Sequence, residues 1–220
     1  MIASEDPQVA VDLPPEHRPS PATLPGKGFA TLGLLFAVLV VATRLPLAPG
    51  QLFSFDDVNF AYAIGEFDPR LSQPQPPGYP LFVVQTRLLH WLRFRRPESN
   101  LLALALIGST AALLALAWAG SRLFDRRTGV LAACLLLVHH SFWYSGLTSA
   151  LRVQLAFVSA LVAGACYRAW CGERRWIYIS AVLLGAGAGV RPETGVLLLP
   201  LWAAGAWSGS RCWPAKRKAS

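Results

Sequence analysis

Charged side chains are scarce in this sequence. They make up 15% of its 220 residues, whereas roughly a quarter of the residues in a soluble domain are charged. Cysteine is also rare, with four copies that form neither a CxxC pair nor the spacing of a zinc ribbon. The sequence therefore excludes an ordinary soluble domain and a disulfide-built mini-domain.

Apolar residues are abundant instead, at 54% of the chain. A membrane-spanning helix needs about 20 of them, so the supply suffices for about six spans. The candidate spans are residues 28–47, 101–120, 129–140 with an extension toward 143, 147–170, 176–190 and 194–207. We therefore expect an all-α polytopic membrane protein.

The segment 79–94 is apolar but short and two-sided. On a helical wheel one face is polar (Thr86, Arg87, His90 and Arg93). The opposite face is apolar (Leu81, Val84, Leu88, Leu89, Trp91 and Leu92). This pattern is typical of a helix that lies in the membrane interface, so we count it as an interfacial helix in the first outer loop.

The arginines and lysines test this topology. With a cytoplasmic N-terminus and an interfacial helix at 79–94, the three basic clusters at 122–127, 168–175 and 211–218 all fall inside, as the positive-inside rule demands. If 79–94 crossed the membrane, only the cluster at 93–96 would be inside. The net charge of +8 thus reflects membrane orientation, and we expect no nucleic-acid partner.

The chain divides into three parts. Residues 1–27 are rich in proline and polar side chains and predict a disordered cytoplasmic tail. Residues 28–208 form the transmembrane module, and residues 209–220 form a basic cytoplasmic tail.

The unusual polar residues share the predicted outer side. They are an acidic pair (Asp56 and Asp57), a turn at 73–80 with sequence QPQPPGYP, the loop HHSFWYSG at 139–146, Arg152, and an Arg-Pro-Glu turn at 191–193. Because the topology brings these segments to one surface, we expect a functional site there.

The acidic pair has two chemical interpretations and a structural one. A carboxylate at the membrane surface can accept a proton from a hydroxyl nucleophile or hold a divalent cation. Alternatively, the pair lies in a solvated loop, or Asp57 is the N-cap of a following helix. Between the two carboxylates Asp57 is favoured as a base, because it can cap the helix while facing the proline turn.

Two arginines are candidates for binding an anion. Arg191 precedes Pro192 at the start of the last span, where free backbone N–H groups and positive charge together suit a phosphate. It could equally anchor the helix at the interface or pair with Glu193. Arg152 lies one turn inside an apolar span, where a charge is costly and suggests a function.

These motifs in their order resemble a known family. The likeness is to the GT-C membrane glycosyltransferases. It rests on the acidic loop FSFDDVNFAYAIGEFDP at 53–69, the turn QPPGYPLF at 75–82, FWYSG at 142–146 and GAGAGVRPE at 185–193. The nearest likeness is to the bacterial branch related to protein O-mannosyltransferases. The resemblance covers residues 28 to 207 approximately.

The resemblance implies a reaction. Such enzymes transfer a sugar from a polyprenyl-phosphate donor to an acceptor hydroxyl on a protein or glycan, outside the membrane. It makes Asp57 or Asp56 the catalytic base, and Arg191 and Arg152 the donor-phosphate ligands. The turn containing Gln75 and Tyr79 becomes a substrate loop.

The partners and location follow from the same likeness. No cofactor is expected, although a divalent metal at the acidic pair is a second option. The expected partners are the lipid-linked sugar, membrane lipids and the acceptor protein or glycan. The expected location is the bacterial inner membrane.

Two departures from the family support an alternative. The segment TSALRVQ at 148–154 has no carboxylate where many relatives have one, and the sequence is shorter than family members generally are. The alternative is an inactive accessory, lipid-binding or transport module of the same fold. A separately encoded C-terminal half is then a further partner.

Overall fold

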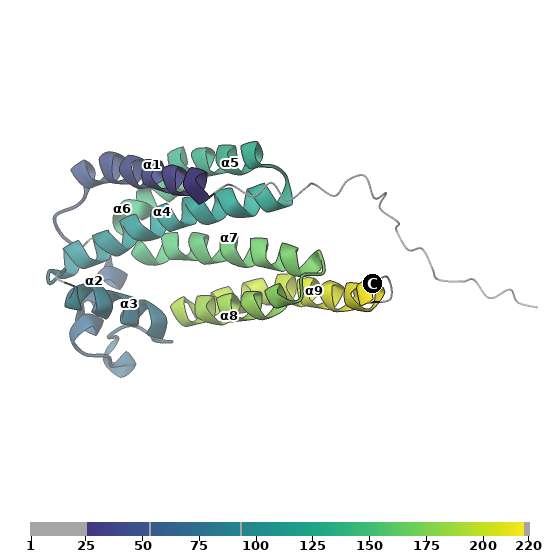
Figure 1. Ribbon diagram of the computed structural model, residues 1–220. Coiled ribbons are helices and arrows are strands. Elements are labelled where there is room, and N and C mark those ends of the chain that lie inside the picture. Colours follow the sequence, from purple (N-terminus) through teal and green to yellow (C-terminus); the bar gives the residue numbers. More distant parts are fainter. Residues whose placement is uncertain (1–25, 53, 93, 218–220) are drawn as a thin grey trace, which may run out of the picture.

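The computed structural model describes residues 26–52, 54–92 and 94–217, with side chains between 28 and 208 (Figure 1). In these residues the regular structure is helical, apart from one isolated bridge between Asp68 and Gln73. The expected all-α class is confirmed. The predicted N-terminal tail falls on residues outside the described part, except for the start of the first helix.

Each of the six predicted spans overlaps a helix of one bundle, and α6 is an additional helix. The helices are α1 (Gly26–Arg44), α4 (Pro97–Leu123), α5 (Arg126–Val138), α6 (His140–Thr148), α7 (Ala150–Trp170), α8 (Arg175–Val190) and α9 (Pro192–Arg217). Helix α9 continues through residues 209–217, which the sequence assigned to a basic tail.

Not every bundle helix is long enough to cross a membrane by itself. Among the described residues three helices meet the length and apolarity expected of a span, namely α1 with its extension to Leu47, α4 and α7. The pair α5 and α6 makes a fourth if it counts as one span bent by 62°. Helix α8 is apolar but has only 16 residues.

The expected loop at 139–146 is wrong, because these residues belong almost entirely to α6. The backbone of His139 is extended, with φ −66° and ψ 123°, so it ends α5 and begins α6 in a new direction. The apolar run therefore continues as a second helix after the bend.

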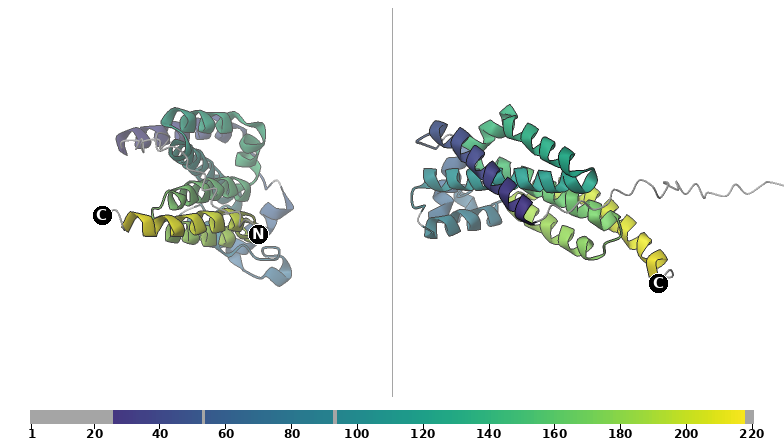
Figure 2. Two further views of the ribbon diagram at one scale, coloured as in Figure 1. Left: turned by 90° about the vertical axis from the view of Figure 1, so that its right-hand side faces the viewer. Right: turned by 45° about the horizontal axis from the view of Figure 1, so that its top comes forward.

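Helix α4 is the centre of the bundle (Figure 2). It packs against α1, α5 and α6 on one side and against α7 on the other, and α7 in turn contacts α8 and α9. Glycine allows the closest approach: a Cβ added to Gly120 of α4 would lie 2.7 Å from the Cα of Gly129 in α5. Small residues at such crossings let membrane helices pack by their backbones.

The glycines of α8 have different roles. A Cβ at Gly187 would lie 2.6 Å from Val158 of α7, and one at Gly189 would lie 2.6 Å from Leu81. Gly185 has no atom within 4 Å of such a Cβ. The glycines therefore allow close packing at two of these three positions.

The ends of the bundle separate the polar motifs from the basic ones. Helices α2 (Phe55–Gly65) and α3 (Pro80–Trp91) lie at the end where α4 begins and where α8 meets α9 (Figure 1). The turns between α4 and α5 and between α7 and α8, which carry the basic clusters, lie at the opposite end. This grouping agrees with the predicted topology.

Helix α3 is the expected amphipathic segment. It exposes Leu81, Val84, Leu88 and Trp91, and Thr86 of the predicted polar face is fully buried. Asn100, at the start of α4, fastens it by donating its side-chain N–H groups to the carbonyls of Thr86 at 2.8 Å and Phe94 at 3.3 Å.

Candidate functional site

Asp57 helps to begin helix α2. Ser54 is the N-cap, and its Oγ accepts a hydrogen bond from the backbone N–H of Asp57 at 3.2 Å. The Oδ2 of Asp57 accepts from the hydroxyl of Ser54 at 2.9 Å and from its backbone N–H at 3.2 Å. This is a capping box. The N-cap expected at Asp57 is therefore Ser54, three residues earlier.

Asp56 is exposed and contacts the proline turn. The side-chain amide of Gln75 donates to its Oδ1 at 2.8 Å, and the Oε1 of Gln75 accepts from Asn59 at 3.3 Å. The chain of three polar groups links α2 to the turn that precedes α3. Asp56 is therefore the carboxylate that contacts the proline turn. The sequence favoured Asp57 for this contact.

Tyr79 places the end of the proline turn against α2. It is the residue before Pro80, its φ is 45°, and its ring meets that of Phe60 edge-on at 5.5 Å. Its side chain is buried. Burial raises the pKa of the Tyr79 phenol, and the negative charges of Glu193 and Asp56 raise it further, while Arg191 opposes them.

Arg191 and Glu193 form an ion pair at the junction of α8 and α9. The Nε of Arg191 donates to the carboxylate of Glu193. This bond raises the pKa of Arg191 and lowers that of Glu193. The partner that the sequence offered as an alternative to an anion is thus present. The start of α3 meets the end of α8, since a Cβ at Gly189 would lie 2.6 Å from Leu81. This contact brings the Arg191–Glu193 pair to the turn that holds Tyr79, Gln75 and Asp56, and we call these five side chains the polar cluster.

Arg152 is separate from this group. It is exposed near the start of α7, and among the described residues its side chain has no hydrogen bond or ion pair. The structure therefore connects Arg191, but not Arg152, to the acidic loop and the turn.

An apolar groove begins beside the polar cluster. It has a volume of about 430 Å³ and lies between α3, α4, α7 and α8. Leu81 and Val190 line it, two residues after Tyr79 and one before Arg191. The amides of Gln85 and Gln154 are its polar lining groups. The sequence reasoning missed Gln154, although a polar side chain within an apolar span is a signal of function.

A smaller pocket of about 30 Å³ lies beside Asp57, and Glu98 also lines it. Its size suits about one or two water molecules. In the described part of the chain no three His, Cys, Asp or Glu side chains form a group that could hold a metal ion. Of the two histidines at the α5–α6 bend, His140 stacks on Tyr144 with ring centroids 6.5 Å apart.

Arg44, at the end of α1, is a buried cation that sequence reasoning missed. It is 0% exposed, and none of its three guanidinium nitrogens has a hydrogen-bond partner among the described residues. Its Cζ lies 5.4 Å from the ring centroid of Phe142. The available signal was an arginine within an otherwise apolar run.

The helical bundle defines a polytopic membrane protein, and its polar cluster lies beside an apolar groove. A family model described as dolichyl-phosphate-mannose-protein mannosyltransferase matches residues 75–220. The chain belongs to this family, which is one of membrane glycosyltransferases of the mannosyltransferase type. No curated protein and no solved structure matches the chain.

The matched region contains most of the site. Gln75, Tyr79, Arg152 and Arg191 lie within it, whereas the acidic loop at 54–69 precedes it. The roles of the acidic residues therefore rest on their geometry.

Proposed function

We propose that this protein transfers a sugar from a polyprenyl-phosphate donor to an acceptor hydroxyl of a protein or glycan on the outer side of the bacterial inner membrane. The observation that carries the proposal is the position of the polar cluster at the end of the apolar groove. A lipid-linked donor needs both parts, because its tail stays in an apolar environment while its phosphate reaches the surface.

Asp56 is the better candidate for the catalytic base. Its carboxylate is exposed, and Gln75 holds one oxygen in place. Asp57 is buried and its Oδ2 is engaged by the cap of α2, so we assign it to positioning the loop. In the reaction Asp56 would take the proton of the acceptor hydroxyl as that oxygen bonds to the anomeric carbon. The bond from that carbon to the donor phosphate oxygen breaks, and polyprenyl phosphate leaves.

Arg191 would neutralise the departing phosphate. Its ion pair with Glu193 engages Nε, and a guanidinium carries four further N–H groups. A charged hydrogen bond to the phosphate stabilises the negative charge that develops as the bond breaks. Arg152 is the second candidate for binding the donor phosphate, and its positive charge would act from outside the polar cluster.

The test of the base compares two adjacent carboxylates. Membranes with wild type, Asp56→Asn or Asp57→Asn are assayed for transfer of radiolabelled sugar from lipid donors. We expect Asp56→Asn to lower the rate by about 10²–10⁴-fold, since the amide cannot take the proton. Asp57→Asn is the matched control and should keep most activity.

Each other result has a defined meaning. Loss of activity with Asp57→Asn alone would make Asp57 the base, and full activity of both variants would refute a base in this loop. An inactive wild type, even with any separately encoded C-terminal half, would favour the accessory or lipid-binding module.

The role of Arg191 is tested by binding of polyprenyl phosphate. A charge-assisted hydrogen bond contributes about 1.5–3 kcal/mol, so Arg191→Ala should weaken binding by roughly 10- to 150-fold. This variant also leaves Glu193 unpaired, and the double variant Arg191→Ala with Glu193→Gln removes that added repulsion. Glu193→Gln alone should strengthen binding, because it frees the guanidinium. Unchanged affinity in the double variant would exclude Arg191 as the phosphate ligand.

A further inference from the structure

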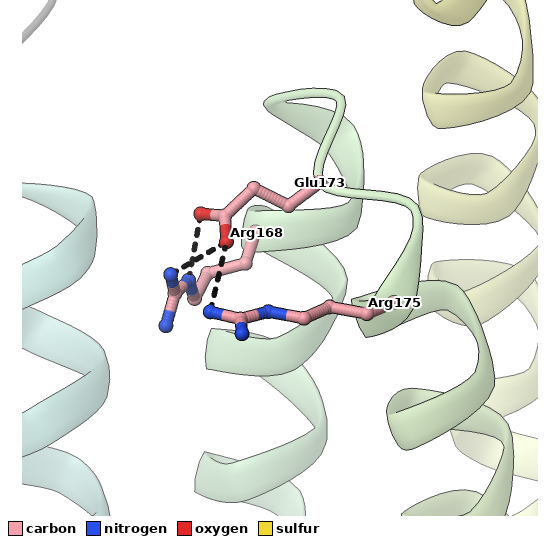
Figure 3. Close-up of polar contacts among 3 residues, drawn as sticks. All are labelled: Arg168, Glu173 and Arg175. Atoms are coloured by element: carbon pink, nitrogen blue, oxygen red, sulfur yellow. Dashed lines mark hydrogen bonds and ion pairs between the residues drawn. The ribbon is translucent and has the colours of Figure 1, made fainter.

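A compact ion network lies at the end of the bundle opposite to the polar cluster (Figure 3). Arg168 donates to both carboxylate oxygens of Glu173, at 2.9 and 2.6 Å, and Arg175 lies 3.7 Å from the same carboxylate. The guanidinium of Arg168 also covers the ring of Trp176 at 4.3 Å. Glu173 therefore holds Arg168 tightly, while the side chain of Arg175 remains 71% exposed.

Two buried donors beside this network lack an acceptor. Neither the Nε of Arg122 nor the indole N–H of Trp176 has a hydrogen-bond partner in the described residues. The two are neighbours through Trp118, which lies one turn before Arg122 on α4 and whose ring is 5.7 Å from that of Trp176. Buried donors without acceptors are unfavourable and uncommon, so this place favours a ligand rich in acceptor oxygens.

An apolar groove leads away from these donors. We call it the inner groove; its volume is about 440 Å³, and its lining comes from α1, α4, α7 and α8. Trp118 and Trp176 line its basic end. Ala111 lines it seven residues from Trp118, which is about 10 Å along the axis of α4. That length is about two thirds of the roughly 15 Å of one leaflet.

We propose that the basic end binds an anionic phospholipid of the cytoplasmic leaflet, with its phosphate on Arg122 and Arg175 and one acyl chain in the inner groove. The charge is complementary, because Arg168 and Arg175 share a single carboxylate, that of Glu173, and Arg122 in the last turn of α4 adds a further positive charge at this end of the bundle. Basic pockets between membrane helices on the cytoplasmic side bind anionic headgroups in this way. The indole N–H of Trp176 is a further donor for the headgroup. This inference does not depend on the proposed reaction.

The experiment measures lipid affinity of the full chain in a neutral detergent. Dioleoyl phosphatidylglycerol is compared with dioleoyl phosphatidylcholine, which has the same chains without net charge, and with glycerol 3-phosphate, which has no chains. We expect tight binding of the first lipid alone. The test variant is Arg122→Gln with Arg175→Gln. The matched control is Arg126→Gln with Arg127→Gln, which changes net charge equally at exposed positions at the start of α5.

The two variants should differ clearly. Each arginine that contacts the headgroup contributes about 1 kcal/mol to binding of an anionic lipid, so the test variant should lose roughly 30-fold in affinity. The control should lose little. Equal loss in both variants, or equal affinity for the two lipids, would refute a specific site and leave only general surface charge.

The groove and the identity of the lipid are tested separately. Ala115→Leu narrows the inner groove without a change of charge and should weaken binding of phosphatidylglycerol. Unchanged binding would refute the placement of the chain. If polyprenyl phosphate depends on Arg122 and Arg175 more strongly than phosphatidylglycerol does, the site belongs to the donor and the proposal is wrong.

Discussion

The crossing of α4 and α5 makes a sharp prediction about Gly129. A Cβ at this position would lie 2.4 Å from the carbonyl oxygen of Ala117 and 2.7 Å from the backbone nitrogen of Ser121. Both atoms belong to the backbone of α4, so no side chain can rotate away. Normal contacts are about 3.5–4.0 Å, and Gly129→Ala must therefore separate the two helices by about 1 Å.

The magnitude follows from two opposing effects. Overpacking of a tight contact costs about 1–3 kcal/mol. Alanine recovers about 0.8–1 kcal/mol through its higher helix propensity than glycine. We expect Gly129→Ala to lower the free energy of unfolding by up to about 2 kcal/mol. Gly185→Ala is the matched control: its new Cβ meets no atom within 4 Å, so propensity alone should leave stability unchanged or raise it by up to about 1 kcal/mol.

The measurement is unfolding of the purified protein by SDS titration from a mild detergent, followed by far-ultraviolet circular dichroism. The two alanine variants should differ by about 1–3 kcal/mol, because both gain helix propensity and only Gly129→Ala has the cost of overpacking. Equal stabilities would refute the backbone contact between α4 and α5 at Gly129.

Three further predictions concern polar groups. Asn100→Leu removes the donors to the carbonyls of Thr86 and Phe94, so it should lower the free energy of unfolding by about 1–3 kcal/mol, and proteolysis near α3 should speed up; unchanged stability would contradict the role of Asn100. Arg44→Met removes a fully buried cation without a hydrogen-bond partner in the described residues and should raise the unfolding free energy by about 1 kcal/mol or more; a loss would show that the guanidinium stabilises the fold. The raised pKa of Tyr79 means that the fold favours the neutral phenol. Its contribution to the free energy of unfolding is therefore present below the usual pKa of about 10 and is lost as pH rises through the higher pKa of the folded state. The difference in absorbance at 295 nm between wild type and Tyr79→Phe should titrate above the usual value.

The polar cluster shows why a site is harder to predict than its members. The sequence identified Asp56, Gln75, Tyr79 and Arg191, because such residues are unusual next to apolar runs and the predicted topology puts them on one side. It did not show which carboxylate meets the turn. That choice depends on the capping box of α2, which engages Asp57 with Ser54 and leaves Asp56 to accept from Gln75.

By itself the sequence determined the helical class, the approximate bounds of the bundle helices and the grouping of basic and polar turns at opposite ends. These properties follow from the lengths of apolar runs and from the positions of arginines, which are local or additive features of the chain. The ion pair of Arg191 with Glu193 was also among the interpretations that the sequence allowed, since only Pro192 separates them.

Only the tertiary structure decided the burial of Arg44, the two apolar grooves and the unpartnered donors of Arg122 and Trp176. Each depends on how α4 packs against helices that come much earlier or later in the chain. The tertiary structure also decided the bend at His139, because an apolar run is compatible with one straight helix or with two helices joined at an angle. Hydropathy records how much apolar surface a helix has, but the packing of its neighbours decides which part of that surface remains open to a ligand.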